Sequence, residues 1–252
     1  MKKVTDIKYA DYPACKLDLF LPECSHFPVL IFFHGGGLEM GDKEDNGDLF
    51  AILMDKGIAA VSANYRMYPD ASYPDFIIDA AAAVSWVHNH IGEYGQCEDI
   101  FIAGSSAGAY LAAMICLDER YLSVHNMRPD EIAGYLFNSA QPTTHYNVLR
   151  ERGMDTRRVL IDEAAPVYHI AENTNSAPIL ILVSDHDMPN RLEQTKLFYN
   201  TLTLFGHNAR LLVMEGFEHC EYDHATDAHG NHILSTIVIQ FINGAISCKT
   251  EA

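Results

Sequence analysis

Short apolar runs alternate with amphipathic stretches along most of this 252-residue chain. Seven runs have the length and residue types of buried strands, and they cover residues 16–21, 29–33, 58–64, 99–103, 133–138, 179–184 and 209–214. Stretches with helical patterning follow several of them, at residues 76–90, 107–117, 193–205 and 233–246. This alternation predicts an α/β fold, with a mostly parallel sheet covered by helices on both faces.

The alternation is interrupted once. Residues 141–170 lie between two predicted strands, and the centre of this segment, residues 149–158, is charged. Loops of that length in compact domains are commonly functional, although a surface helix with ion pairs would have the same composition. Because the chain has neither a low-complexity linker nor an internal repeat, we expect residues 1–252 to form a single domain.

A pentapeptide of the form G-x-S-x-G, Gly104-Ser105-Ser106-Ala107-Gly108, joins the strand at 99–103 to the helix at 107–117. In such a strand–turn–helix context, the sharp turn strains the central residue and lifts its hydroxyl clear of the sheet. The pentapeptide alone arises by chance in small-residue loops, so the prediction depends on its placement. That placement predicts Ser106 as a nucleophile.

A second glycine-rich motif, His34-Gly35-Gly36-Gly37, follows the apolar run at residues 28–33. Glycines leave backbone N–H groups uncovered, and such groups can bind a developing oxyanion. A phosphate-binding loop is the alternative, but no Lys-Ser/Thr pair follows and no G-x-G-x-x-G pattern is present. The motif therefore favours an oxyanion hole.

These two motifs, in this order, resemble the α/β-hydrolase superfamily and within it the HGGG-type esterase and lipase branch, either hormone-sensitive-lipase-like or compact carbohydrate-esterase-like. The segment Asn64-Tyr65-Arg66-Met67-Tyr68-Pro69-Asp70 resembles the "NYRLAPE" strand end of that branch. Pro74, Asp79 and Trp86 fall where the family carries the same residue types. The resemblance covers nearly the whole chain. It implies an oxyanion hole from the N–H groups of Gly36, Gly37 and Ala107, with Gly35 able to replace one of them.

A serine nucleophile needs a base, and that base needs an orienting carboxylate. The resemblance implies the order Ser, Asp, His, and places the acid a few residues past the strand at 179–184. This favours Asp187 over Asp185, which could instead cap a turn. His219, after a glycine turn beyond the last strand, is the expected base; the other nearby histidines lie farther along or at the wrong end of the strand: His207, His224, His229 and His232.

In the resembling fold, an insertion at residues 141–170 forms a cap over the active site. We therefore expect a small cap, with Tyr146 and Tyr168 as candidates for lining the substrate pocket. A short cap favours short acyl groups.

The resemblance implies a serine esterase that acts through an acyl-enzyme and needs no cofactor, with acetyl or feruloyl esters of carbohydrates as one substrate class. An amide hydrolase, such as an aryl formamidase or a small-peptide hydrolase, uses the same triad. A third alternative is a catalytically silent protein with the same fold that only binds a small ligand. Such a protein would not need an intact triad, so the presence of Ser106, Asp187 and His219 argues against it.

Charge and composition exclude several classes of binding partner. Seventeen basic and 34 acidic residues give a net charge of −17, which opposes binding to nucleic acid or an anionic membrane and mildly disfavours strongly anionic substrates. The histidines and carboxylates of residues 218–232 do not reproduce a known metal-binding spacing, so we expect no metal. The sequence leaves a homo-oligomer open.

Six cysteines without close pairing suggest reduced thiols and a cytoplasmic protein: Cys15, Cys24, Cys97, Cys116, Cys220 and Cys248. Because no apolar stretch follows the two N-terminal lysines, we expect no signal peptide, and no apolar run is long enough to span a bilayer. A secreted protein trimmed of its signal would begin in the same way.

Overall fold

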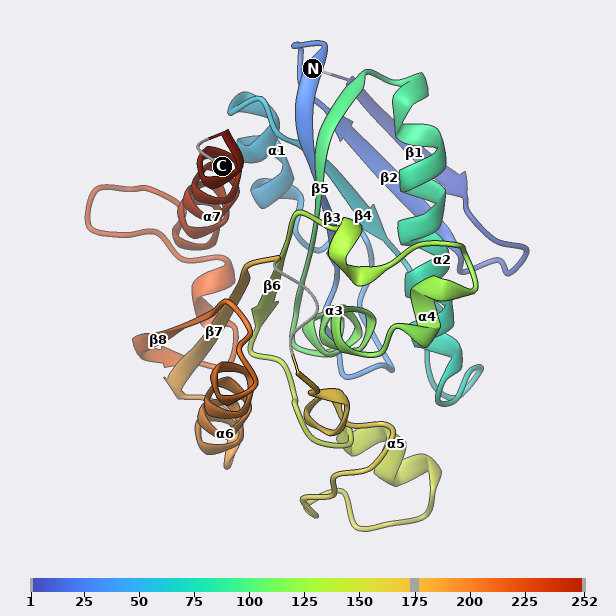
Figure 1. Ribbon diagram of the computed structural model, residues 1–252, viewed down its shortest axis with the longest axis vertical. Helices are drawn as coiled ribbons and strands as arrows, with labels where there is room; N and C mark the ends of the chain where they lie inside the picture. The colour runs from blue at the N-terminus through green and yellow to red at the C-terminus, as the bar shows by residue number, and fades with distance from the viewer. Residues whose placement is uncertain (1, 173–176, 251–252) are drawn as a thin grey trace.

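An eight-stranded sheet runs through the molecule in the computed structural model, which describes residues 2–172 and 177–250 (Figure 1). The strands are β1 (Lys2–Lys8), β2 (Lys16–Leu21), β3 (His26–Phe33), β4 (Ala59–Ala63), β5 (Gln96–Ser105), β6 (Gly134–Asn138), β7 (Ile179–His186) and β8 (Ala209–Glu218). Their order is β1-β2-β4-β3-β5-β6-β7-β8. β1 and β2 are antiparallel to their neighbours, and the pairs from β4 to β8 are parallel.

Helices cover both faces of this sheet. They are α1 (Gly47–Asp55), α2 (Asp75–His90), α3 (Ala107–Leu117), α4 (Arg120–Ser123), α5 (Tyr146–Glu151), α6 (Arg191–Leu204) and α7 (Ile233–Thr250). α1 and α7 bury their apolar side chains on one face, whereas α2, α3 and α6 bury theirs on the other. The predicted α/β-hydrolase fold is therefore observed.

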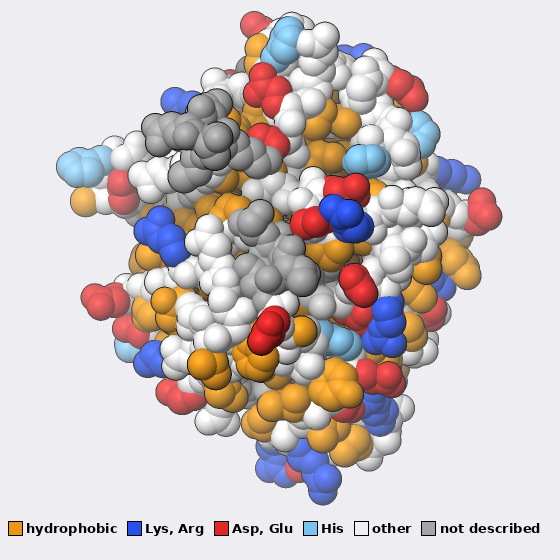
Figure 2. All heavy atoms as spheres, viewed as in Figure 1, with side chains coloured by type: hydrophobic (Ala, Val, Ile, Leu, Met, Phe, Trp, Pro, Cys, Tyr) orange, Lys and Arg blue, Asp and Glu red, His pale blue; other side chains and the backbone are white. Residues whose placement is uncertain are grey.

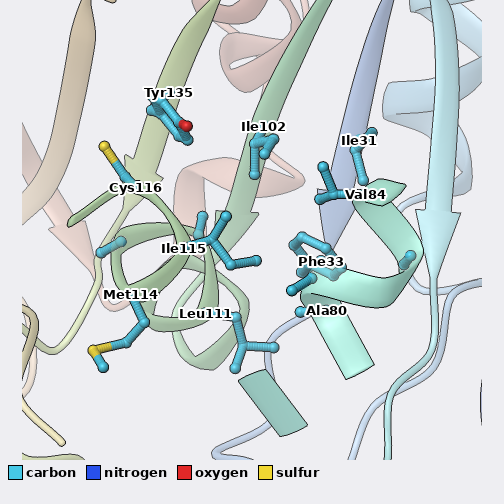
Figure 3. Packing of buried hydrophobic residues seen from close by; sticks show 14 of the residues in the cluster. Ile31, Phe33, Ala80, Val84, Ile102, Leu111, Met114, Ile115, Cys116 and Tyr135 are labelled. Atoms are coloured by element: carbon cyan, nitrogen blue, oxygen red, sulfur yellow. The ribbon is translucent and has the colours of Figure 1, made fainter. Parts of the chain in front are cut away.

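The central strand β3 contributes to both cores. Val29, Ile31 and Phe33 point to the face of α2 and α3, and Leu30 and Phe32 point to the face of α1 and α7. Figure 3 shows the first of these cores, where Ile31 and Phe33 face side chains of α2 and α3. Burial on both faces is why the run reads as continuously apolar in the sequence.

All seven predicted strands and all four predicted helices are confirmed, with ends that differ by a few residues. The edge strand β1 was missed, and no defined helix was predicted at the positions of the short helices α1, α4 and α5. β1 is a polar edge strand, and no residue in it is fully buried. α1 is short, with Leu49, Phe50 and Leu53 as its buried residues.

Backbones approach one another unusually closely where β3, β5 and α3 meet. A Cβ atom on Gly104 would lie 2.4 Å from the carbonyl carbon of Gly108. A Cβ on Gly108 would lie 2.0 Å from the backbone oxygen of Phe33. Only glycine fits at these two contacts, because the neighbouring atoms belong to backbone and cannot rotate away.

In the part of the chain that the structure describes, no helix is both long and apolar enough to cross a membrane. The cysteines whose side chains are described have free thiols: Cys15, Cys24, Cys97, Cys116 and Cys220. The side chain of Cys248 lies outside the described residues.

We expect Gly108→Ala to lower the free energy of unfolding by about 1–3 kcal/mol or more, because the added methyl group must displace the backbone of β3. The control is Gly244→Ala, since nothing lies within 4 Å of a Cβ at that position in α7. That change should be neutral or stabilising by up to about 1 kcal/mol. Urea unfolding followed by circular dichroism measures both. Equal stability of the two variants would contradict the proposed close packing.

Candidate active site

Ser106 lies at the turn between β5 and α3, in a backbone conformation that side chains rarely adopt. Its φ is 53° and its ψ is −112°. The surrounding structure holds this conformation: the N–H of Ser106 donates to the backbone oxygen of Asn138 at 2.7 Å, and its own carbonyl accepts from Tyr110 at 3.0 Å. A strained residue fixed in this way presents its side chain at a defined position.

A continuous line of hydrogen-bonding atoms joins Ser106 to a histidine and a carboxylate. Nε2 of His219 lies 2.8 Å from Oγ of Ser106. Nδ1 of the same ring lies 2.6 Å from Oδ1 of Asp187. The three residues follow the carboxyl ends of β5, β7 and β8, which meet at one edge of the sheet.

Asp187 is held ionised by its contacts. Its side chain is only 1% exposed, and burial opposes the charged form. The hydrogen bond from His219 and the backbone N–H of Met188 outweigh this cost, so the pKa of Asp187 lies below its usual value. An ionised carboxylate at Nδ1 fixes the orientation of the imidazole ring and can stabilise its positive form.

Asp185, the alternative acid, makes a different contact. Its Oδ1 accepts a hydrogen bond of 2.8 Å from the backbone N–H of Gly216. This bond links the ends of β7 and β8. The structure therefore brings Asp187 to His219 and leaves Asp185 as a brace between two strands.

The glycine loop after β3 lies directly against Ser106. Gly36 and Gly37 have φ values of 102° and 67°. The carbonyl of Gly36 accepts from the N–H groups of Glu39 and Met40 at 3.1 and 3.0 Å. Because a peptide unit is planar and trans, the N–H of Gly37 points the opposite way, out of this turn. Ala107 begins α3, where N–H groups have no partner within the helix.

Ser106 and His219 open into a cleft of about 630 Å³. The cleft is lined by the glycine loop, the turn after β5, and residues that follow β7 and β8, and it includes Glu39, Tyr146, Met188, Cys220, Asp223 and His224. The structure places Tyr146 in the lining of the cleft that contains Ser106, with its hydroxyl 1.9 Å from where a Cβ on Gly37 would be. The prediction for Tyr168 is corrected. It lies on the turn η3 (Pro166–His169), which packs against α3, and it is 59% exposed.

A buried polar network beneath Ser106 was missed in the sequence. The carboxylate of Asp223, in the turn η4 (Glu221–Asp223), accepts hydrogen bonds of 2.6 Å from both Ser105 Oγ and Asn138 Nδ2. Tyr222 donates its hydroxyl proton to Asn138 Oδ1. These contacts tie the segment that follows His219 to the ends of β5 and β6. The sequence offered no local signal for them, since Asp223 is one of several acidic residues in that segment.

The sequence also contained a cluster of histidines and carboxylates near residue 219. Within residues 2–172 and 177–250, the structure contains no group of three or more His, Cys, Asp or Glu side chains arranged to hold a metal ion.

Burial raises the pKa of Asp223, although its hydrogen bonds from Ser105 and Asn138 act in the opposite direction. Since the folded-state pKa lies above the unfolded one, Asp223 contributes most to stability below the unfolded pKa of about 4, and that contribution is lost as pH rises through the folded value. Asn at this position does not titrate. The stability of Asp223→Asn relative to the wild type should therefore increase from pH 4 to pH 7. Urea unfolding across this range measures the difference, and a pH-independent difference would contradict the raised pKa.

Comparison with known proteins places this arrangement in context. A probable isoprenylcysteine alpha-carbonyl methylesterase from Arabidopsis thaliana is 38% identical over 116 residues, which is 45% of this chain but only 24% of that protein. A kynurenine formamidase from Danio rerio is 26% identical over 208 residues, covering 80% of this chain and 69% of the relative. Esterase B from Lactobacillus rhamnosis superposes with a TM-score of 0.78 at 16% identity, covering 99% of this chain and 88% of that one.

The solved structure shares the fold at low identity, and the first of these relatives is about four times as long as the region it shares with this chain. The sequence model of one family also matches this chain. It spans residues 17–149, more than half of the chain, and includes the glycine loop and the turn that carries Ser106. The chain therefore belongs to the BD-FAE family, within the esterase and lipase group of the α/β-hydrolase fold.

Proposed function

We propose that this protein hydrolyses carboxylic esters with Ser106, His219 and Asp187 as its catalytic triad. The observation that carries the proposal is the line of contacts from Asp187 Oδ1 through both nitrogens of His219 to Ser106 Oγ, at 2.6 and 2.8 Å. Heavy-atom distances of this size are those required for proton transfer between a nucleophile and its base. The names of two of the similar proteins, a methylesterase and an esterase, support the same reaction.

The reaction proceeds in two steps. Ser106 Oγ attacks the ester carbonyl while His219 Nε2 accepts its proton, and Asp187 stabilises the resulting imidazolium. The N–H groups of Gly36, Gly37 and Ala107 bind the oxyanion that forms. His219 then protonates the leaving alcohol, and water hydrolyses the acyl-enzyme by the same route in reverse.

The small cap favours short acyl groups. The six-residue helix α5 is the only α-helix in residues 141–170 of the described chain, so no extended apolar segment covers the cleft. Acetyl and feruloyl esters of carbohydrates belong in the substrate panel, alongside simple esters of increasing acyl length.

Formamide hydrolysis is a second candidate, because the relative whose match extends over 80% of this chain is named a kynurenine formamidase. The same triad serves both reactions, since amides and esters form similar tetrahedral intermediates. Comparing kcat/KM for phenyl acetate with that for N-formylaniline distinguishes them.

We expect Ser106→Ala to abolish hydrolysis of p-nitrophenyl acetate, with a loss on the order of 10⁶ in kcat, while the protein remains folded. A fluorophosphonate probe should label the wild type at Ser106 and leave the variant unlabelled. Circular dichroism controls for folding. Activity retained in a folded Ser106→Ala variant would refute the proposal.

The two aspartates after β7 provide a matched pair. Asp187→Asn should lower kcat by about 10⁴, because an amide cannot hold the imidazole in the required tautomer. Asp185→Asn keeps an oxygen that can accept from Gly216, so its kcat should stay within a few-fold of the wild type. A larger loss in Asp185→Asn than in Asp187→Asn would overturn the assignment of the acid.

A further inference from the structure

A second cavity adjoins the catalytic cleft. It has a volume of about 490 Å³ and shares Glu39, Tyr146 and Met188 with the cleft. The rest of its lining comes from residues 141–158 and from residues 189–194, which lead into and begin α6. Because three side chains border both spaces, the far end of a substrate bound at Ser106 lies within reach of this cavity.

The charge of this cavity is opposite to that of the whole chain. Four arginines line it, Arg150, Arg157, Arg158 and Arg191, whereas Glu39 is the one carboxylate among its described lining residues. The chain as a whole carries a net charge of −17. In Figure 2, Lys and Arg side chains gather at the end of the molecule where α5 and the loop after it lie in Figure 1.

Two of these arginines are neutralised within the protein. Arg150 pairs with Glu39, and Arg157 pairs with Asp155 at 2.6 Å. Across residues 2–172 and 177–250, no carboxylate lies within ion-pair distance of Arg158 or Arg191. The cavity therefore holds two guanidinium groups without a paired anion.

Arg191 is the more informative of these two. It is only 5% exposed, and its guanidinium donates to the backbone oxygen of Ser139 at 2.6 Å and to Gln141 Oε1 at 3.4 Å. Both acceptors are neutral. A third contact of 3.9 Å joins the guanidinium to Met188 Sδ, and Asp187 acts on it only from beyond ion-pair distance. The guanidinium has more N–H donors than these contacts use, and a buried charge without a directly paired counter-ion is costly. Such a group, at the wall of a cavity beside a reactive serine, is suited to bind an anion.

We propose that this arginine cavity binds a carboxylate carried by the substrate, so that the preferred substrates are esters with one negative charge away from the scissile bond. This inference rests on the proposed ester hydrolysis. Arg158 and Arg191 supply planar, paired N–H donors that match the two oxygens of a carboxylate. One carboxylate also fits the overall charge better than a dianion does, because the acidic surface repels each additional negative charge.

Matched esters test the proposal on both sides of the scissile bond. On the alcohol side, 4-acetoxybenzoate is compared with its methyl ester; on the acyl side, monomethyl adipate is compared with dimethyl adipate. In at least one pair we expect the anionic ester to have the higher kcat/KM, by about tenfold or more, as two charge-assisted hydrogen bonds would provide. The advantage should decrease as NaCl is raised.

Variants then locate the effect. Arg158→Gln should lower the ratio of anionic to neutral kcat/KM by about tenfold, and Arg158→Lys should restore part of it. The single variant Arg191→Gln should lower the same ratio by more than Arg158→Gln does. Arg128→Gln is the control, since Arg128 is an exposed arginine paired with Asp130 and does not line either cavity. Its ratio should equal that of the wild type.

The outcomes separate the two claims. If neither member of any pair is hydrolysed, the proposed ester hydrolysis fails and the inference fails with it. If neutral esters are hydrolysed at least as well as anionic ones, and the arginine variants leave the ratio unchanged, ester hydrolysis stands and the arginine cavity has no role in binding substrate.

Discussion

The site depends on three backbones that meet without side chains between them. Gly104 and Gly108 let β5, α3 and β3 approach at distances that a methyl group would prevent. This contact sets the position of Ser106 at the turn and also brings the glycine loop that follows β3 against it. A Cβ on Gly35 would lie 3.4 Å from the Cβ of Ser106. Ser106 and the glycine loop are therefore positioned by one packing contact rather than by two independent ones.

Neighbouring residues hold the glycine loop in place from behind. The hydroxyl of Tyr65 donates to the backbone oxygen of His34 at 2.9 Å, and the two rings stack with centroids 4.5 Å apart. The next residue, Arg66, donates to both carboxylate oxygens of Asp79 at 2.8 Å. The segment at residues 64–70, which resembles the family pattern, therefore connects the glycine loop to α2. This connection explains why tyrosine and arginine occur there.

Two buried aspartates near Ser106 show how hydrogen-bond partners decide whether a carboxyl group is ionised. Asp187 faces His219, which can carry a positive charge, and its pKa is lowered despite burial. Asp223 accepts hydrogen bonds from Ser105 and Asn138, which are neutral, and burial raises its pKa. Of the two, only Asp187 is hydrogen-bonded directly to the imidazole ring of His219. The second fixes the backbone on which His219 is carried.

The sequence predicted features that depend on residues close together along the chain, and it did not predict features that depend on residues far apart. Buried strands and the turn around Ser106 depend on neighbours along the chain, so their pattern was sufficient. β1 was not predicted because an edge strand needs no apolar face. The role of Asp223 was not predicted because its partner Ser105 lies 118 residues away in the sequence. Tyr146 and Tyr168 differed for the same reason, since local sequence does not say which tyrosine of the insertion turns toward the cleft.

The arginine cavity shows that the net charge of the sequence does not predict the local charge at a site. A net charge of −17 describes the field that an approaching molecule meets at long range, where salt screens it within about 8–10 Å. Inside a cavity, the nearest charges dominate because each interaction falls with distance, and the protein around the buried Arg191 screens its charge less than water would. Arg158 and Arg191 come from residues 33 positions apart, on the loop after α5 and at the start of α6. Composition therefore mildly disfavoured strongly anionic substrates, whereas the fold concentrates positive charge at one boundary of the cleft that holds Ser106.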